Sequence, residues 1–439
     1  MMTDITTIQM LKSKALTLDK NDPLAPFKQH FTLPENTIYL DGNSLGPLPK
    51  IAKKRAQEVV EQQWGEDLIT SWNKHQWIKL PQQTGAKIAP LLGAAPENVI
   101  VCDSISVNLT KVLCAALAIQ EHSHRLSQSK HASTETSSRT LVLSQKDNFP
   151  TDLYMVQGLS DLLGRARCEL LSVDEQALID TIKSRGHEIA VLILTQVNFR
   201  SGRVHDIKQL SELAQAHGIL VVWDLAHSAG ALELELDEWN VDFALGCTYK
   251  FLNGGPGAPA FIYAAKKHHH QIKQPVSGWM GHKRPFEFSH DYEPADALNS
   301  FLAGTPPVVS MSILDAALSV FDGISSSQLR QKSVALSTLF LEAFEYLIED
   351  PKFKLVSPTN AEERGAQLAF SHPQSYAICQ ALIAKGVIAD FRAPDILRFG
   401  FSPLFLSYKQ MLEAIKCLQA IMQNKSYLLE EFQVKQAVT

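Results

Sequence analysis

The sequence predicts an α/β fold with a mostly parallel central sheet flanked by helices, followed by a smaller α+β domain. Short apolar runs alternate with helix-like segments through the first two thirds of the chain, which is typical of a parallel sheet with right-handed crossovers. From about residue 325, long helices and isolated strands replace this alternation. The expected division is a large domain at 50–305, a linking helix at 308–323, and a small domain made of 1–49 and 325–439.

Composition limits the class of protein. The chain has 439 residues, of which 45% are hydrophobic, so it can form a large core. Its formal net charge of −5 gives no electrostatic footprint for nucleic acid. No apolar run is long enough to span a bilayer, and no secretory signal pattern opens the sequence. Six scattered cysteines indicate reduced thiols rather than disulfides or a zinc site. We therefore expect a cytoplasmic protein without a metal, a membrane or a nucleic acid partner.

The first hundred residues are predicted to hold two helices and a turn-rich loop. Helices are expected at 5–18 and at 51–64. Between them, residues 39–49 are rich in glycine, asparagine and proline, so this segment turns rather than pairs as a strand. On its composition alone, it is a linking loop.

A strand at 98–103 is expected to lead into a helix at 109–118. Ser104 and Ser106 stand at the junction of these two elements. Hydroxyls and backbone amides at a helix N-terminus either cap the helix or bind a phosphate group. From the residues alone, helix capping and phosphate binding are equally supported.

The segment 122–139 is polar, serine-rich and without periodicity, so we expect a flexible surface insertion there. After it, the alternation of strands and helices resumes. The expected strands are 140–144, 168–171 and 189–197, and the expected helices begin at 153, 174 and 207.

Two neighbouring strands carry residues with candidate chemistry. The apolar run 219–225 holds Asp224 near its carboxyl end, where open α/β sheets bind their ligands. Lys250 lies between apolar runs that begin at 243 and 258. A lysine desolvated there is suited to form a Schiff base with pyridoxal phosphate, and a carboxylate can pair with the protonated pyridine nitrogen. Singly, the lysine could reach solvent and the aspartate could cap a helix; together they favour a cofactor site.

The last third of the chain contains one arginine inside an apolar strand. Arg398 lies in the run 395–400 and requires an anionic partner there. That partner is either a substrate carboxylate held by the guanidinium fork or an internal carboxylate, and the residues alone do not choose. The other expected elements are helices at 308–321, 329–348 and 374–385 and strands at 354–357 and 367–370.

Three separated motifs resemble those of the kynureninases, pyridoxal phosphate-dependent hydrolases of the aspartate aminotransferase fold. They are YLDGNSLGPLP at 39–49, DLAHSAGAL from Asp224, and GCTYKFLNGGPGAPAF from Gly246. The resemblance runs from about residue 39 into the 400s and keeps the family's motif order. The lysine motif alone is shared loosely with cysteine desulfurases.

The resemblance implies roles for individual residues. Three would be catalytic, namely Lys250, Tyr249 and Asp224. Cofactor contacts would come from Ile105, Ser106, Phe149, Pro150, Thr151, Asp152, Thr195, Asp224, His227, Tyr249, Lys250, Trp279 and Thr305. Substrate contacts would come from Asn43, Ser44 and Arg398. Thr305 stands where relatives often have asparagine, so a hydroxyl replaces an amide there.

The activity implied is hydrolysis of the Cβ–Cγ bond of L-kynurenine or 3-hydroxykynurenine, in tryptophan catabolism and NAD biosynthesis. A homodimer is implied, in which Trp279 and Thr305 complete the phosphate site, either within the subunit or from its partner. The alternatives are a cysteine desulfurase-like or aminotransferase-like enzyme of the same fold, and a non-catalytic scaffold that binds the cofactor. Cys247 on a strand and Cys379 in a helix are not placed like a desulfurase nucleophile, which needs a mobile loop.

Overall fold

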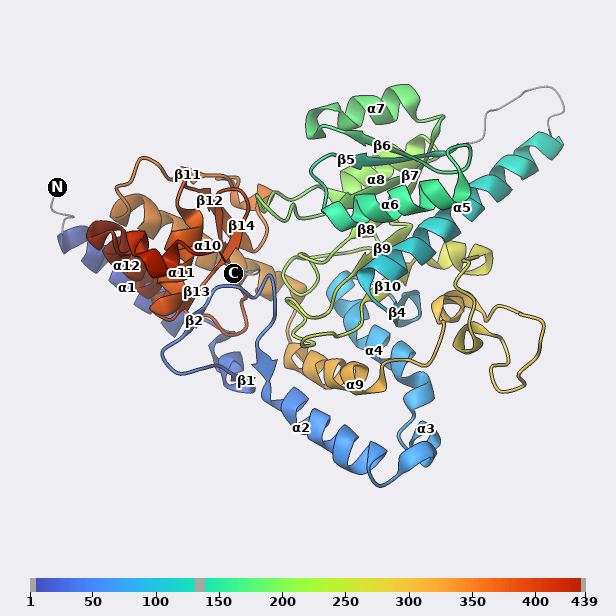
Figure 1. The fold of residues 1–439 in the computed structure, drawn as a ribbon, viewed down its shortest axis with the longest axis horizontal. Coiled ribbons are helices and arrows are strands. Elements are labelled where there is room, and N and C mark those ends of the chain that lie inside the picture. The colour runs from blue at the N-terminus through green and yellow to red at the C-terminus, as the bar shows by residue number, and fades with distance from the viewer. Residues whose placement is uncertain (1–4, 131–138, 436–439) are drawn as a thin grey trace.

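Two β-sheets lie side by side in the computed structural model, which describes residues 5–130 and 139–435 (Figure 1). The larger sheet is on the right of Figure 1 and the smaller one on the left. The N-terminal helix α1 (Ile5–Lys20) lies with the smaller sheet, although it is far from that sheet in the sequence.

The larger sheet has seven strands in the order β4-β10-β9-β8-β7-β5-β6. Neighbouring strands from β9 to β6 pair in parallel, whereas β10 is antiparallel to both of its neighbours. The prediction of a mostly parallel central sheet is therefore confirmed. Its strands are β4 (Val99–Val101), β5 (Leu141–Gln145), β6 (Glu169–Val173), β7 (Ile189–Thr195), β8 (Leu220–Asp224), β9 (Phe243–Gly246) and β10 (Phe261–Ala264).

Helices cover both faces of this sheet because both faces are apolar. Alternate strand residues belong to two separate cores: in β10, Phe261 and Tyr263 pack on one side and Ile262 on the other. Helices α5 and α6 contribute to the core that contains Ile262, and the others contribute to the opposite core. The helices are α4 (Leu80–Ile88), α5 (Ile105–Lys130), α6 (Pro150–Leu163), α7 (Leu178–Arg185), α8 (Ile207–Ala216) and α9 (Val308–Ala317).

The smaller sheet has four antiparallel strands in the order β11-β12-β15-β14. Its long helices begin at well-formed caps: Ser325 and Ser407 each form a capping box at the start of α10 and α12. Its elements are β11 (Lys354–Leu355), β12 (Gln367–Ser371), β14 (Asp390–Arg392), β15 (Ile396–Gly400), α10 (Ser326–Leu347), α11 (Ser375–Ala384) and α12 (Tyr408–Asn424).

The first fifty residues join the side of the molecule that holds the smaller sheet. Strand β2 (Ile38–Tyr39) pairs in parallel with β13 (Val387–Ile388), while β1 (Phe31–Thr32) pairs with β3 (Leu48–Pro49). The carboxylate of Asp19, in α1, accepts hydrogen bonds of 2.7 and 2.9 Å from two amides in the first turn of α12. The two ends of the chain therefore build one layer.

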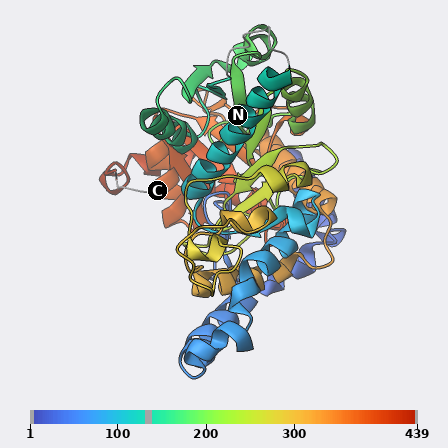
Figure 2. The ribbon, with the colours of Figure 1, turned by 90° about the vertical axis from the view of Figure 1, so that its right-hand side faces the viewer.

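A helical arm projects from this body, at the bottom of Figure 2. It consists of α2 (Lys50–Glu58), a π-helical continuation (Val59–Trp64) and the short helix α3 (Ser71–Lys74). Helix α9, which packs against α2, continues to Phe321 and then meets α10 at a bend of 80°. Within the described ranges, no single helix is long and apolar enough to cross a membrane, and only this bent pair reaches that criterion when taken together.

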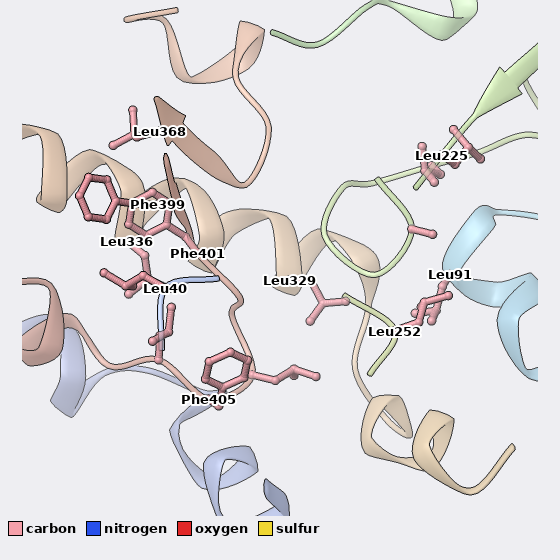
Figure 3. Packing of buried hydrophobic residues seen from close by; sticks show 14 of the residues in the cluster. Leu40, Leu91, Leu225, Leu252, Leu329, Leu336, Leu368, Phe399, Phe401 and Phe405 are labelled. Carbon is pink, nitrogen blue, oxygen red and sulfur yellow. The ribbon is translucent and has the colours of Figure 1, made fainter. Parts of the chain in front are cut away.

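One apolar core joins the two sheets. Leu368 and Phe399 belong to the same cluster as Leu225 and Leu252, which lie beside the larger sheet (Figure 3). Leu329, near the start of α10, lies between the two groups in Figure 3. Because the core is continuous, the position of the smaller sheet is fixed relative to the strand ends of the larger one.

One expectation about the chain's surface was wrong in part. The segment 122–139 was expected to be a flexible insertion, but α5 continues through Lys130. Helix propagation adds one hydrogen bond for each residue that is fixed, and Arg125 also pairs with Glu121 one turn earlier at 2.5 Å. Residues 131–138 of the expected insertion lie outside the described ranges.

Candidate active site

A cavity of about 330 Å³ opens at the carboxyl ends of β5, β7, β8 and β9. This is the edge at which open α/β sheets bind ligands. The lining residues are Ser104, Ile105, Ser106, Phe149, Thr151, Thr195, Phe199, Asp224, Ala226, His227, Cys247, Tyr249, Lys250, Ala258 and Ala260. Nine of the residues expected to contact a cofactor are in this set, although they come from five separate segments of the chain.

Lys250 follows β9 and meets His227, which follows β8. The Lys250 Nζ atom lies 2.9 Å from Nε2 of His227. Burial, and then the positive charge of Lys250, lower the pKa of His227 well below its ordinary value, so the imidazole is neutral at neutral pH. A neutral ring that accepts from the lysine at Nε2 carries its own proton on Nδ1, and Nδ1 has no hydrogen-bond partner among the described residues.

The floor of the cavity holds the carboxyl group of Asp224, and a second buried carboxyl group, that of Asp152, is joined to the lining residue Thr195. Asp224 ends β8 and its Oδ1 accepts from the Ala226 amide at 2.8 Å. Asp152, in the first turn of α6, accepts from Asn148 at 2.9 Å and from the Thr195 hydroxyl at 3.3 Å. Burial raises the pKa of both groups, and the charge of Asp224 raises that of Asp152 further. The floor therefore favours a bound cation or an N–H donor.

Aromatic rings and a helix terminus complete the walls. Phe149 is 37% exposed and meets Phe199 edge to face, with ring centroids 5.3 Å apart. Ser104 and Ser106 flank the first residue of α5, where free backbone amides and the helix dipole attract an anion. The burial of Tyr249 raises the pKa of its phenol, so its hydroxyl stays protonated at neutral pH.

This set of groups fits pyridoxal phosphate. The lysine can bind its aldehyde, the buried carboxylates can pair with its ring nitrogen, and the phenylalanine rings match its flat face. The N-terminus of α5 is suited to its phosphate. The unpartnered Oδ1 of Asp152 is a polar atom that the protein itself leaves available, as far as the described ranges show.

Arg398 lies beside this cavity rather than on its wall. Its guanidinium forks onto the Asp390 carboxylate, with Nε 2.8 Å from Oδ1, and it also donates to the Phe199 carbonyl and, at 3.2 Å, to the Ser44 hydroxyl. The side chain is 1% exposed. An internal carboxylate is therefore its partner in this structure, which is one of the two alternatives left open by the sequence. Asn43 is buried nearby and donates to Gln367 at 3.4 Å.

Four of the expected cofactor contacts are outside the cavity lining within one chain: Asp152, which is joined to the lining residue Thr195, and Pro150, Trp279 and Thr305. Trp279 packs against Trp72, with ring centroids 6.0 Å apart. Thr305 is exposed and lines a separate small hollow of about 20 Å³. Pro150 begins α6 and does not line the cavity. The expectation that Trp279 and Thr305 hold the phosphate therefore requires a second subunit.

Sequence reasoning missed several residues of the site. Phe199 lies four residues after Thr195, the last residue of β7, and this position just beyond a strand end was its signal. Asp390 lies eight residues before Arg398, on the neighbouring strand. Because an arginine inside an apolar strand requires an anionic partner, Arg398 was the signal for this carboxylate. Gln367 carries no signal in the sequence, because only the packing of the smaller sheet brings it to this place.

Solved structures of known enzymes share this architecture. A cysteine desulfurase from Thermococcus onnurineus NA1 matches with a TM-score of 0.72 at 17% identity, covering 92% of this chain and 98% of that one. A cysteine desulfurase from Escherichia coli also matches with a TM-score of 0.72, at 18% identity, covering 92% and 99%. Fold and site together define the class: a pyridoxal phosphate-dependent enzyme of fold type I.

Sequence comparison gives the family. Residues 329–418 match the model of the kynureninase C-terminal domain. The kynureninase of Burkholderia mallei (strain SAVP1) is 43% identical over 428 residues, which are 98% of this chain and 99% of that protein. The kynureninase of Pseudomonas fluorescens is 41% identical with the same coverage. The chain belongs to the kynureninase family, whose members are hydrolases.

Proposed function

We propose that this chain hydrolyses the Cβ–Cγ bond of L-kynurenine or 3-hydroxykynurenine, giving anthranilate or 3-hydroxyanthranilate and L-alanine. The observation that carries the proposal is the Lys250–His227 contact above the Asp224 carboxylate, in a chain that matches kynureninases over almost its full length. Pyridoxal phosphate supplies the electron sink for this chemistry.

The side chains of the protein bind the cofactor and move the protons. Lys250 attaches the cofactor and moves the Cα proton of the substrate. Asp224 holds the ring N–H, and neutral His227 orients the lysine amine at 2.9 Å. Phe149 would stack on the cofactor ring, and Thr151, Thr195 and Asp152 would hold its edge; Phe149, Thr151 and Thr195 line the cavity, and Thr195 donates to Asp152. Ile105 and Ser106 bind the phosphate at the start of α5. The protonated Tyr249 hydroxyl is placed to donate a proton late in the reaction.

Arg398 is proposed to bind the substrate α-carboxylate. Its Nε side is held by Asp390, so the substrate must use the Nη1 and Nη2 edge that now contacts the Phe199 carbonyl and Ser44. Asn43 and Ser44 lie on the loop beside this edge. Exchanging two neutral acceptors for a carboxylate strengthens the interaction, because both partners are then charged.

The assembly is proposed to be a cytoplasmic homodimer. The arm exposes apolar side chains that a single chain leaves uncovered: Trp64 and Leu68 are each 60% exposed, and Ile69 is 77% exposed. A second copy that covers the arm would also bring Trp279 and Thr305 of one subunit toward the cavity of the other. Within each subunit, we propose a large domain at 50–305 and a small domain at 1–49 and 325–439, linked through 308–323.

The experiment is a product assay on the purified protein with pyridoxal phosphate. Kynurenine and 3-hydroxykynurenine are each supplied, and anthranilate or 3-hydroxyanthranilate is quantified against alanine; a one-to-one ratio is expected. Sulfide release from cysteine, or keto acid formation from amino acids, at rates above the kynurenine reaction would refute the proposal. Burial raises the pKa of both Cys247 and Cys379, so neither is a reactive thiolate and sulfide release is not expected.

A further inference from the structure

Gln367 is a buried polar residue that the proposed chemistry does not use. It is the first residue of β12, in the smaller sheet, and is 1% exposed. Its side chain nevertheless reaches the active site in the larger sheet. The amide Nε2 donates to the Phe199 carbonyl at 3.2 Å, and Oε1 accepts from Asn43 at 3.4 Å.

The first target of this amide is the histidine beside Lys250. His227 accepts from Lys250 at Nε2, so its proton lies on Nδ1, the atom left without a hydrogen-bond partner among the described residues. The Gln367 side chain acts to raise the pKa of this imidazole, against the larger lowering caused by burial and by the charge of Lys250. An amide oxygen has two lone pairs, so Oε1 can accept from Nδ1–H as well as from Asn43.

The second target is the aromatic wall. The carbonyl of Phe199 accepts from both Gln367 and Arg398, which lie on the adjacent strands β12 and β15. The ring of the same residue packs edge to face on Phe149, the ring proposed to stack on the cofactor. One amide of the smaller sheet thus contacts the backbone that carries the wall and acts on the ring that orients the lysine.

We propose that Gln367 is a positioning residue, which fixes the His227 ring beside Lys250 through its amide oxygen and holds the Phe199 carbonyl through its amide nitrogen. This inference rests on the proposed role of Lys250. An acceptor on Nδ1–H makes Nε2 more basic, and a more basic Nε2 stabilises the protonated form of the lysine nitrogen. The acidity of that nitrogen in the holoenzyme is therefore set partly from the smaller sheet.

The test is a pH titration of the absorption band of the bound cofactor in three variants. Gln367→Leu removes the acceptor and should lower the midpoint by about half a unit or more. Gln367→Glu replaces a neutral acceptor with an anionic one and should raise the midpoint. The control is Ser357→Ala: the Ser357 hydroxyl joins the same two parts of the chain by donating to the Ser201 carbonyl at 2.6 Å, but it contacts neither His227 nor Phe199. Its midpoint should stay at the wild-type value.

Kinetics give a second readout. Gln367→Leu should reduce kcat/KM about tenfold, mainly through kcat, whereas Ser357→Ala should change stability more than rate. Unchanged midpoints in both glutamine variants, or shifts in the same direction, would overturn the inference. If the leucine variant does not fold, the upward shift in Gln367→Glu decides alone. Borohydride labelling of Lys250 in the wild type is checked first; its absence would instead disprove the role of the lysine.

Discussion

The buried surroundings of Asp41 strongly change the pKa of its side chain. Burial, and then the charge of Asp390, raise the pKa of its carboxyl group to about 7. Its Oδ1 atom is buried and has no hydrogen-bond partner within the described ranges. Arg398 and Arg392 oppose the rise, but both arginines are already paired with Asp390. The folded protein therefore binds a proton that the unfolded chain has released above its ordinary pKa.

The sign of the pH effect follows from this difference. A carboxyl group whose pKa is raised by folding weakens the folded state as pH rises from its ordinary pKa through about 7. Asp41→Asn removes this contribution, so the thermal midpoint of the variant should rise relative to that of the wild type between about pH 4 and about pH 7. Asp161→Asn, an exposed change on α6, is the control and should follow the wild type. A constant difference between Asp41→Asn and the wild type would contradict the interpretation.

Lys250 gives the most direct prediction. Lys250→Ala should lower turnover at least a thousand-fold, on the order expected for loss of a nucleophile that is also the base, and should abolish the covalent label after borohydride treatment. Peptide masses identify the labelled site. Lys146→Ala, an exposed lysine paired with Asp174, serves as the control and should keep full activity. Turnover near the wild-type rate in Lys250→Ala would exclude the proposed mechanism.

The candidate residues were predictable where chemistry follows a strand end. Asp224, Lys250 and Thr195 each stand at or just beyond an apolar run, and the structure brings them to one cavity. Gln367 was not predictable, because its position depends on how the smaller sheet packs against the larger one. No local pattern encodes such a contact.

At the scale of elements, the loop before α2 meets the lysine loop very closely. The Gly46 amide donates to the Tyr249 carbonyl at 2.7 Å. A Cβ at Gly46 would lie 2.4 Å from the Lys250 carbonyl oxygen and 2.7 Å from Cα of Asn253. Both are backbone atoms, so a larger side chain can be accommodated only if the lysine loop moves. Gly46 thus allows the close contact that positions Lys250, which lies about two hundred residues later in the chain.

Gly46→Ala should therefore reduce kcat/KM by about a hundredfold, because the displaced loop carries the nucleophile. It should also destabilise the fold by about 1–3 kcal/mol. Steady-state rates and thermal denaturation measure both effects. In the matched control, Gly158→Ala, a Cβ on helix α6 meets nothing within 4 Å, so stability should be unchanged or rise by roughly 0.5–1 kcal/mol. Equal activity in the two variants would contradict the steric argument.

Most elements were predicted near their true positions, and the misses have local causes. The helix expected at 109–118 begins at Ile105 and continues to Lys130, because polar residues that break an apolar pattern do not break a helix. The helix expected at 51–64 changes to π-helical geometry at Val59, a change of hydrogen bonding that apolar periodicity does not report.

At the scale of the whole molecule, the arm tests the proposed homodimer. Replacing both Leu68 and Ile69 by glutamate puts charge into the surface that a second copy is proposed to cover. Light scattering should then give 48.7 kDa, the mass of one chain, instead of twice that mass. Cofactor affinity should fall with it, because each cavity is proposed to take Trp279 and Thr305 from its partner. Leu162→Glu, at a side chain 78% exposed on α6, is the control, and a dimeric mass for the double variant would exclude this interface.

The fold class was readable from the alternation of strands and helices, yet the relation between the two sheets was not. The combination of 1–49 with 325–439 in one small domain stays a prediction; β2 pairs with β13, and Asp19 accepts from the first amides of α12. The buried ion pair between Asp22 and Lys332, 2.7 Å long, ties the same two parts of the chain. Such long-range pairs depend on three-dimensional packing, which periodicity alone does not describe.

The packing of α1 against helices near the other end of the chain has a consequence for biosynthesis. Leu11 and Ala15 of α1 are almost fully buried in the finished protein, yet α12 leaves the ribosome some four hundred codons later. Until α10 and then α12 emerge, the apolar face of α1 therefore lacks the helices on which it packs in the finished protein. A nascent chain of this kind is a natural client for chaperones, and the last helix to emerge completes the docking of the first.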